Sequence, residues 1–168
     1  PLPQALGGGK DQQGRVNNSF PGSLGNRWKM RFYIATGLSN AERAKTLAGV
    51  LTRNGHEFTY NWTEHGDIRS EGEDRMTEVA FSEVRAVRDA EMFIALLPGG
   101  CGTHTEIGIA IASRSNKRVI LWSETGDEFT KPDRCCAFYF HPAVERICCP
   151  FEELISKLDA DRIDTSLS

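Results

Sequence analysis

One glutamate stands inside an otherwise apolar segment that follows a glycine-rich turn. Glu106 lies between the turn at 98–102 and the apolar residues 107–112, which we expect to form a buried helix that Thr103 caps. An ionised carboxylate is costly to bury, but the free amides and the dipole of a first helical turn favour negative charge. Such a group is suited to act as a nucleophile. The alternative is that Glu106 merely occupies a helix start.

A second glutamate falls on the apolar side of another predicted helix, 74–88. Glu83 lies within the stripe that marks the buried side of this helix, formed by Met76, Val79, Ala80, Val84 and Val87. The alternative is a glutamate at the edge of the stripe that reaches water through its flexible stem. Two inward carboxylates on separate elements suggest glycosyl chemistry, in which one attacks an anomeric carbon and the other handles protons at the leaving group.

Four further side chains near these carboxylates have two interpretations each. Tyr33 is placed either to present its hydroxyl to Glu106 or to pack against a helix. Trp62 is either a stacking surface for a planar base or a core residue. His104 is either a ligand contact or a capping or surface residue. Cys101 is either a nucleophile, for which no orienting partner beyond His104 is apparent, or a packing or bystander thiol.

Apolar runs and turn residues give the order of the elements that position these groups. The strands are predicted at 30–36, 56–62, 92–97, 118–123 and 137–140. Helices are predicted from a capping box at 39–42 to Arg53, then at 74–88 and 103–112, and from Pro150 onwards. This order predicts an α/β fold, a three-layer α/β/α sandwich with a mostly parallel sheet of about five strands, flavodoxin-like or Rossmann-like. The polar loop 63–74 is expected to cover the pocket.

The chain of 168 residues is long enough for one domain with a proper core. Residues 1–29 are rich in Gly, Pro, Asn, Gln and Ser, and we expect a flexible N-terminal extension, with Met30 as a plausible natural start. The alternative is that Phe20, Leu24 and Trp28 dock on the domain or on a partner subunit. The domain is expected to span 30–160, followed by a frayed tail at 161–168.

Composition argues against several classes of function. A net charge of −3 without a Lys/Arg cluster gives no footprint for a nucleic acid polymer, and no apolar stretch approaches membrane-spanning length. Five cysteines without a secretion signal indicate free thiols in a reducing cytoplasm. Neither cysteines nor histidines show metal-ligand spacing, and the dinucleotide fingerprint is missing after the first strand, so we expect no metal and no cofactor.

Three segments resemble the nucleoside 2-deoxyribosyltransferase family, which includes the 2′-deoxynucleoside 5′-phosphate N-hydrolases. They are Tyr33-Ile-Ala-Thr-Gly37, Thr59-Tyr-Asn-Trp-Thr63 and Leu97-Pro-Gly-Gly-Cys-Gly-Thr-His-Thr-Glu-Ile-Gly108. The resemblance implies an enzyme that cleaves the N-glycosidic bond of deoxyribonucleosides or their 5′-monophosphates and transfers the sugar to another base or to water. It also implies a flavodoxin-like fold and a homodimer or larger homo-oligomer in which a partner subunit completes the pocket.

The resemblance assigns roles by position. Glu106 matches the glutamate that attacks C1′ and forms a covalent glycosyl-enzyme, and Tyr33 matches the tyrosine that holds it. Glu83 stands where the family usually has an aspartate that assists departure of the base. The expected substrate-binding residues, including those weighed above, are Gly37, Ser39, Trp62, Gly99, Gly100, Gly102, Thr103 and His104.

The sequence departs from the family at two places. The nucleotide hydrolases have an arginine near the position of Ser39, and the transferases have an aspartate in the turn before Glu106, where this chain has glycine. Backbone amides at the two helix starts remain available for a phosphate.

Residues 98–106 also resemble the P-G-G-x-G-T-x-x-E signature of cytokinin-activating phosphoribohydrolases, which act on ribonucleoside monophosphates. A third possibility is a nucleotide sensor without catalysis, motivated by the change to glutamate at Glu83.

Overall fold

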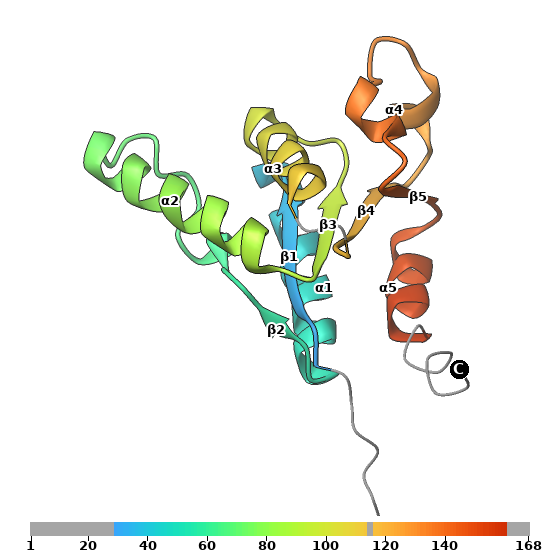
Figure 1. The fold of residues 1–168 in the computed structure, drawn as a ribbon, viewed down its shortest axis with the longest axis horizontal. Coiled ribbons are helices and arrows are strands. Elements are labelled where there is room, and N and C mark those ends of the chain that lie inside the picture. The colour runs from blue at the N-terminus through green and yellow to red at the C-terminus, as the bar shows by residue number, and fades with distance from the viewer. Residues whose placement is uncertain (1–28, 114–115, 161–168) are drawn as a thin grey trace, which may run out of the picture.

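The fold is a five-stranded parallel sheet with helices on both faces (Figure 1), in a computed structural model that describes residues 29–113 and 116–160. The strands run in the order β2-β1-β3-β4-β5 and every adjacent pair is parallel. Their bounds are β1 Arg31–Thr36, β2 Glu57–Phe58, β3 Met92–Leu96, β4 Arg118–Ser123 and β5 Val144–Cys148. The predicted fold class is confirmed. The predictions for 1–28 and 161–168 lie outside the described residues.

Helices form the two outer layers. Figure 1 shows α2 and α3 on one side of the sheet and α1 on the other, where α5 packs against α1. Their bounds are α1 Ala41–Arg53, α2 Glu73–Asp89, α3 Cys101–Ala112, α4 Asp127–Thr130 and α5 Phe151–Ala160, with short 3-10 helices η1 Leu38–Asn40, η2 Trp62–Glu64 and η3 Ala137–Phe140. None of the helices in the described ranges is long and apolar enough to cross a membrane.

The core lies around the central strand β3, whose five residues are all buried. Strands with apolar side chains on both faces are expected where helices cover both sides of a sheet. The predicted inward positions of α1 (Ala44, Leu47, Ala48 and Leu51) are all buried, which confirms that helix face.

Two strand predictions are wrong. The second strand was expected at 56–62, but β2 covers only Glu57–Phe58, because the indole N–H of Trp62 donates to the carbonyl of Ile34 and the chain coils into η2. The last strand was expected at 137–140, which is η3. The strand at this sheet edge is β5, and its half-exposed, charged sequence hides the strand pattern because an edge strand needs little burial.

Two helix starts also differ from expectation. The capping box at 39–42 is absent, because Ser39 lies in η1 and the N-cap residue Asn40 makes no side-chain cap bond. Thr103 does not cap α3, which begins at Cys101 with Gly100 as its N-cap. Thr103 is instead the third residue of the helix and is buried.

Candidate active site

The candidate site lies where β1 and β3 end side by side. Thr36 and Leu96 are register partners at the carboxyl ends of these strands, and the chain departs from them in different directions. Such a switch point in strand order is where open α/β sheets bind ligands. The loop after β1 lies against the glycine-rich turn, since a Cβ on Gly37 would be 3.8 Å from the amide nitrogen of Gly100 and 3.9 Å from Ser39 Oγ.

Tyr33 and Glu106 meet beside this switch point. The Tyr33 hydroxyl donates a short hydrogen bond to Glu106 Oε1. Tyr33 is fully buried in β1 and Glu106 is only 9% exposed in α3. Burial, followed by the nearby charge of Glu106, raises the pKa of Tyr33, so its hydroxyl stays a hydrogen-bond donor at any ordinary pH. The expected contact between the two side chains is therefore present, whereas their catalytic roles remain predictions.

The protonation of Glu106 differs from expectation. Burial raises its pKa to about 8, the bond from Tyr33 opposes this rise, and the charge of Glu83 adds to it. Glu106 is also the sixth residue of α3 rather than part of its first turn, so the helix amides compensate the carboxylate less than expected. The raised pKa therefore runs against the prediction of an ionised carboxylate, because burial favours the protonated form.

Glu83 of α2 is close enough for its charge to act on Glu106 and Tyr33. Its side chain is half-buried, and burial raises its pKa while the charge of His65 lowers it. The inward orientation predicted from the helix stripe is therefore supported, and the two carboxyl groups are electrostatically coupled, as a nucleophile and a proton donor at one bond would be.

The glycine-rich turn packs tightly at one position and is open at two others. A Cβ on Gly99 would lie 2.5 Å from Thr103 Cβ, so only glycine fits there. A Cβ on Gly100 or Gly102 would meet nothing within 4 Å. These two glycines therefore leave open space at the start of α3, which fits the expectation that a ligand lies there.

Trp62 and His104, two of the predicted substrate-binding residues, form hydrogen bonds with other residues of the protein. The Trp62 side chain is 6% exposed, and its N–H lies 2.7 Å from the carbonyl of Ile34. The Nδ1–H of His104 donates to the Gly100 carbonyl at 2.7 Å, and His104 Nε2 accepts from the Tyr139 hydroxyl at 2.7 Å. Trp62 thus anchors η2 to β1, and His104 joins α3 to η3, while their contacts with substrate remain predictions.

His65 is a candidate that reasoning from the sequence did not single out. Its ring packs 5.8 Å from that of Tyr60, its Nδ1 lies 3.1 Å from the Gly66 carbonyl, and its Nε2 is buried without a hydrogen-bond partner. Its charge acts on Glu83. In the sequence, His65 could have been recognised from its position in the polar loop 63–74, because this loop was expected to cover the pocket.

Comparison with known proteins supports the fold. A solved structure of the CMP N-glycosidase BcmB from Clostridium botulinum is similar, with a TM-score of 0.52 and 23% identity, over 77% of this chain and 98% of that one. No protein-family model matches the chain, and no curated protein matches its sequence. The site and the structural likeness together define an α/β protein of the flavodoxin-like type with paired carboxyl groups at its switch point.

Proposed function

We propose that the protein cleaves the N-glycosidic bond of 2′-deoxyribonucleosides or their 5′-monophosphates through a covalent glycosyl–Glu106 intermediate. The observation that carries the proposal is the buried Glu106 carboxyl, held by Tyr33 and coupled to Glu83. Conversion of a glycosidic bond into an ester and then into product needs two such groups, one nucleophilic and one able to exchange a proton.

In the first step, an ionised Glu106 oxygen forms a bond to C1′ while the C1′–N bond breaks. The electron pair of that bond goes to the base, and protonated Glu83 gives the base its proton. In the second step, water or an acceptor base attacks C1′, Glu83 takes the proton that is released, and Glu106 leaves as a carboxylate. The raised pKa of Glu83 favours the proton that the first step needs, and Tyr33 stabilises Glu106 as an anion.

A ribonucleoside 5′-monophosphate is the second candidate substrate. The similar fold of an enzyme named for its action on CMP favours it, as does the resemblance of residues 98–106 to the phosphoribohydrolase signature. The chemistry at Glu106 is the same for both sugars, because the 2′ substituent does not take part in either step.

The deciding experiment measures base release from four deoxynucleosides, their monophosphates, and ribonucleotides including CMP and AMP, with and without an acceptor base. Release from deoxy substrates alone supports the first candidate, and release from ribonucleotides alone supports the second. Exchange that requires added base identifies a transferase. Glu106→Gln is expected to abolish turnover, and an unchanged rate would remove Glu106 from the mechanism. Saturable binding of a nucleotide without any product would identify a sensor.

The proposal includes a homodimer formed through α2 and α3. The predicted buried stripe of α2 is only partly covered, since Met76 is 42% exposed and Val84 39%, and Ala80 is also exposed. Phe81, on the same helix, is 75% exposed. The predicted burial is therefore confirmed for Val79 and Val87 and wrong for the other three positions. A helix surface with this much exposed apolar area is typical of an interface.

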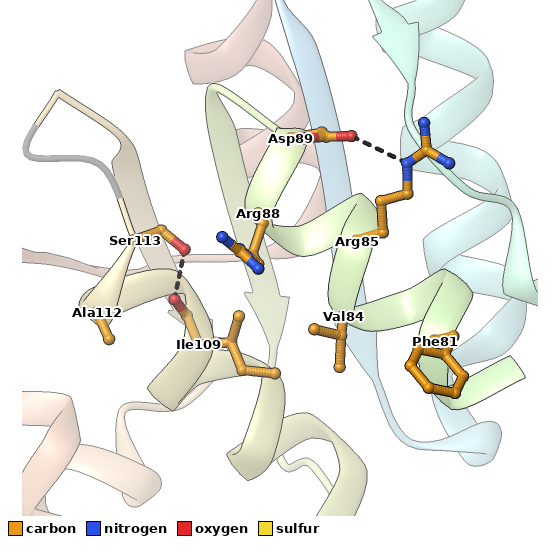
Figure 2. Close-up of a pocket in the computed structure, with 8 residues that line it drawn as sticks. All are labelled: Phe81, Val84, Arg85, Arg88, Asp89, Ile109, Ala112 and Ser113. Carbon is orange, nitrogen blue, oxygen red and sulfur yellow. Dashed lines mark hydrogen bonds and ion pairs between the residues drawn. The ribbon is translucent and has the colours of Figure 1, made fainter. Parts of the chain in front are cut away.

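Figure 2 shows the groove between the two helices, which has a volume of about 930 Å³. Val84 from α2 and Ile109 from α3 lie on facing sides, and Arg85 pairs with Asp89 at 3.6 Å. A surface with apolar side chains and both signs of charge is self-complementary, as a two-fold interface requires. Phe81→Asp is expected to convert a dimer into a monomer in light scattering after size exclusion. A wild-type protein that is monomeric at high concentration would end this part of the proposal.

A further inference from the structure

A second cavity lies beside the glycine-rich turn. Its volume is about 320 Å³, and it is lined by Pro98, Gly99, His104, Glu128, Arg134 and Tyr139. Pro98 and Gly99 belong to the turn that precedes α3, and Glu128, Arg134 and Tyr139 belong to the segment 124–140 that follows β4. The cavity therefore lies between the glycine-rich turn and a segment whose role the proposed function leaves open.

The segment 124–140 is held firmly against α3. The Tyr139 hydroxyl donates to His104 Nε2, and the Tyr139 side chain is 2% exposed. Burial raises the pKa of Tyr139 to about 12, so this hydroxyl remains a donor across the physiological range. Phe129 packs edge-on against Tyr139 at 6.1 Å. These contacts fix the backbone that carries Arg134 relative to the turn at Gly99.

Arg134 is anchored at one end of its guanidinium group. Its Nη1 lies 3.2 Å from Asp127 Oδ2 and 3.8 Å from Glu128 Oε1. Neither contact uses Nε or Nη2, which together form the side-on fork of an arginine. This fork matches two oxygens of a phosphate, and a guanidinium that is already anchored loses less freedom when it binds one.

Glu128, the acidic residue that lines the cavity, has a hydrogen-bond donor at one oxygen and a cation near the other. Glu128 is 5% exposed, and the Ser123 hydroxyl donates to its Oε2 at 2.5 Å. Its Oε1 faces Nη1 of Arg134, on the side of the guanidinium away from the fork. Gly99, which lines the same cavity as Arg134, lies next to the start of α3, where the first amides of a helix lack intrahelical partners and no side chain caps Gly100.

The dimensions suit a nucleotide. The five residue steps from Cys101 to Glu106 rise roughly 7.5 Å along the helix axis, a distance that a pentose with a 5′-phosphate spans. Glu106 bonds to Tyr33 of β1 and His104 bonds to Tyr139 of η3, so α3 carries both the candidate nucleophile and a residue that lines the cavity of Arg134. We propose that Arg134 binds the 5′-phosphate of the substrate and makes the protein selective for nucleoside 5′-monophosphates over nucleosides. This inference rests on the proposed function, and it supplies from the segment after β4 the arginine that is missing near Ser39.

The test compares kcat/KM for the best 5′-monophosphate and for the matching nucleoside in the wild type and in Arg134→Gln. Loss of a hydrogen bond to a charged group is expected to lower kcat/KM for the monophosphate about 10–100-fold, mainly through KM. The value for the nucleoside should stay within about twofold. Arg134→Lys, which keeps the charge but loses the fork, should fall in between. The control Lys131→Gln removes a cation that pairs with the same Asp127 at 2.7 Å, and it should resemble the wild type.

Equal losses for both substrates, or no loss for the monophosphate, would overturn the assignment of Arg134. A second measurement does not depend on turnover. Inorganic phosphate should raise the melting temperature of the wild type and of Lys131→Gln but not that of Arg134→Gln, and equal protection of all three would also overturn it. If no substrate is cleaved while phosphate protects only proteins with Arg134, the proposed function fails and the phosphate site stands.

Discussion

Replacement of Glu106 by glutamine should stabilise the protein, and increasingly so as the pH rises. The pKa of Glu106 is raised from the 4.5 of an exposed glutamate to about 8, chiefly by burial. A carboxyl group with a higher pKa in the folded state stabilises the fold fully below its unfolded pKa. This contribution is lost as the pH rises towards the folded pKa, because the unfolded chain ionises first.

The expected size follows from the two pKa values. Relative to the protonated form, the wild type loses less than about 1 kcal/mol of unfolding free energy at pH 5 and roughly 3 kcal/mol at pH 7. Glutamine keeps the shape of the side chain and an oxygen that accepts from Tyr33, but it has no charge to desolvate. The gain of Glu106→Gln over the wild type should therefore grow by roughly 2–3 kcal/mol between pH 5 and pH 7.

Urea unfolding of both proteins at pH 5, 6, 7 and 8 measures this difference. The control is Glu64→Gln, which changes an exposed glutamate of η2 and should show no comparable trend. A gain that is the same at every pH would mean that Glu106 ionises like an exposed glutamate, and the reasoning from its burial would be refuted.

Three further substitutions have defined outcomes. Tyr33→Phe removes the hydrogen bond that lowers the pKa of Glu106, so the rising limb of the pH profile of kcat/KM should move to higher pH. If the limb does not move, the bond does not set the pKa of Glu106. Glu83→Gln should be slower, and because it removes a charge that raises the pKa of Glu106, its rising limb should move to lower pH. A shift to higher pH would contradict the electrostatic coupling between Glu83 and Glu106. Trp62→Phe leaves the carbonyl of Ile34 without its indole donor and should lower the free energy of unfolding in urea by about 1–3 kcal/mol. An unchanged urea midpoint would mean that this hydrogen bond does not contribute to stability.

The opposite shifts of the pH profile expected for Tyr33→Phe and Glu83→Gln would show how neighbouring groups control the ionisation of Glu106. Glu106 is mainly protonated at neutral pH, so the reactive form must be reached by loss of a proton. Tyr33 favours that loss and Glu83 opposes it while ionised. Protonation of Glu83 therefore favours ionisation of Glu106, and the same distribution of protons is the one that base departure requires.

Features that depend on local pattern could be predicted from the order of the residues. A continuous apolar run is enough to specify a strand covered on both faces, so β4 was predicted with its bounds, 118–123, and β3 to within one residue. The helical spacing of Ala44, Leu47, Ala48 and Leu51 specified one buried face. The glycine-rich turn and Glu106 were evident because a glycine cluster and a lone charge in an apolar segment need no knowledge of distant residues.

Features that depend on residues far apart in the sequence arise from the packing of the folded chain. The bond from Tyr33 to Glu106 joins residues 73 positions apart, and the pKa of Glu106 follows from the burial that the folded layers create. The strand β5 lies at an edge where little burial is required, so its charged sequence carried no strand signal. Arg134 lines the same cavity as the glycine-rich turn because Tyr139 of η3 bonds to His104 of α3. Periodicity records which side of an element is apolar, whereas packing alone decides which elements meet there.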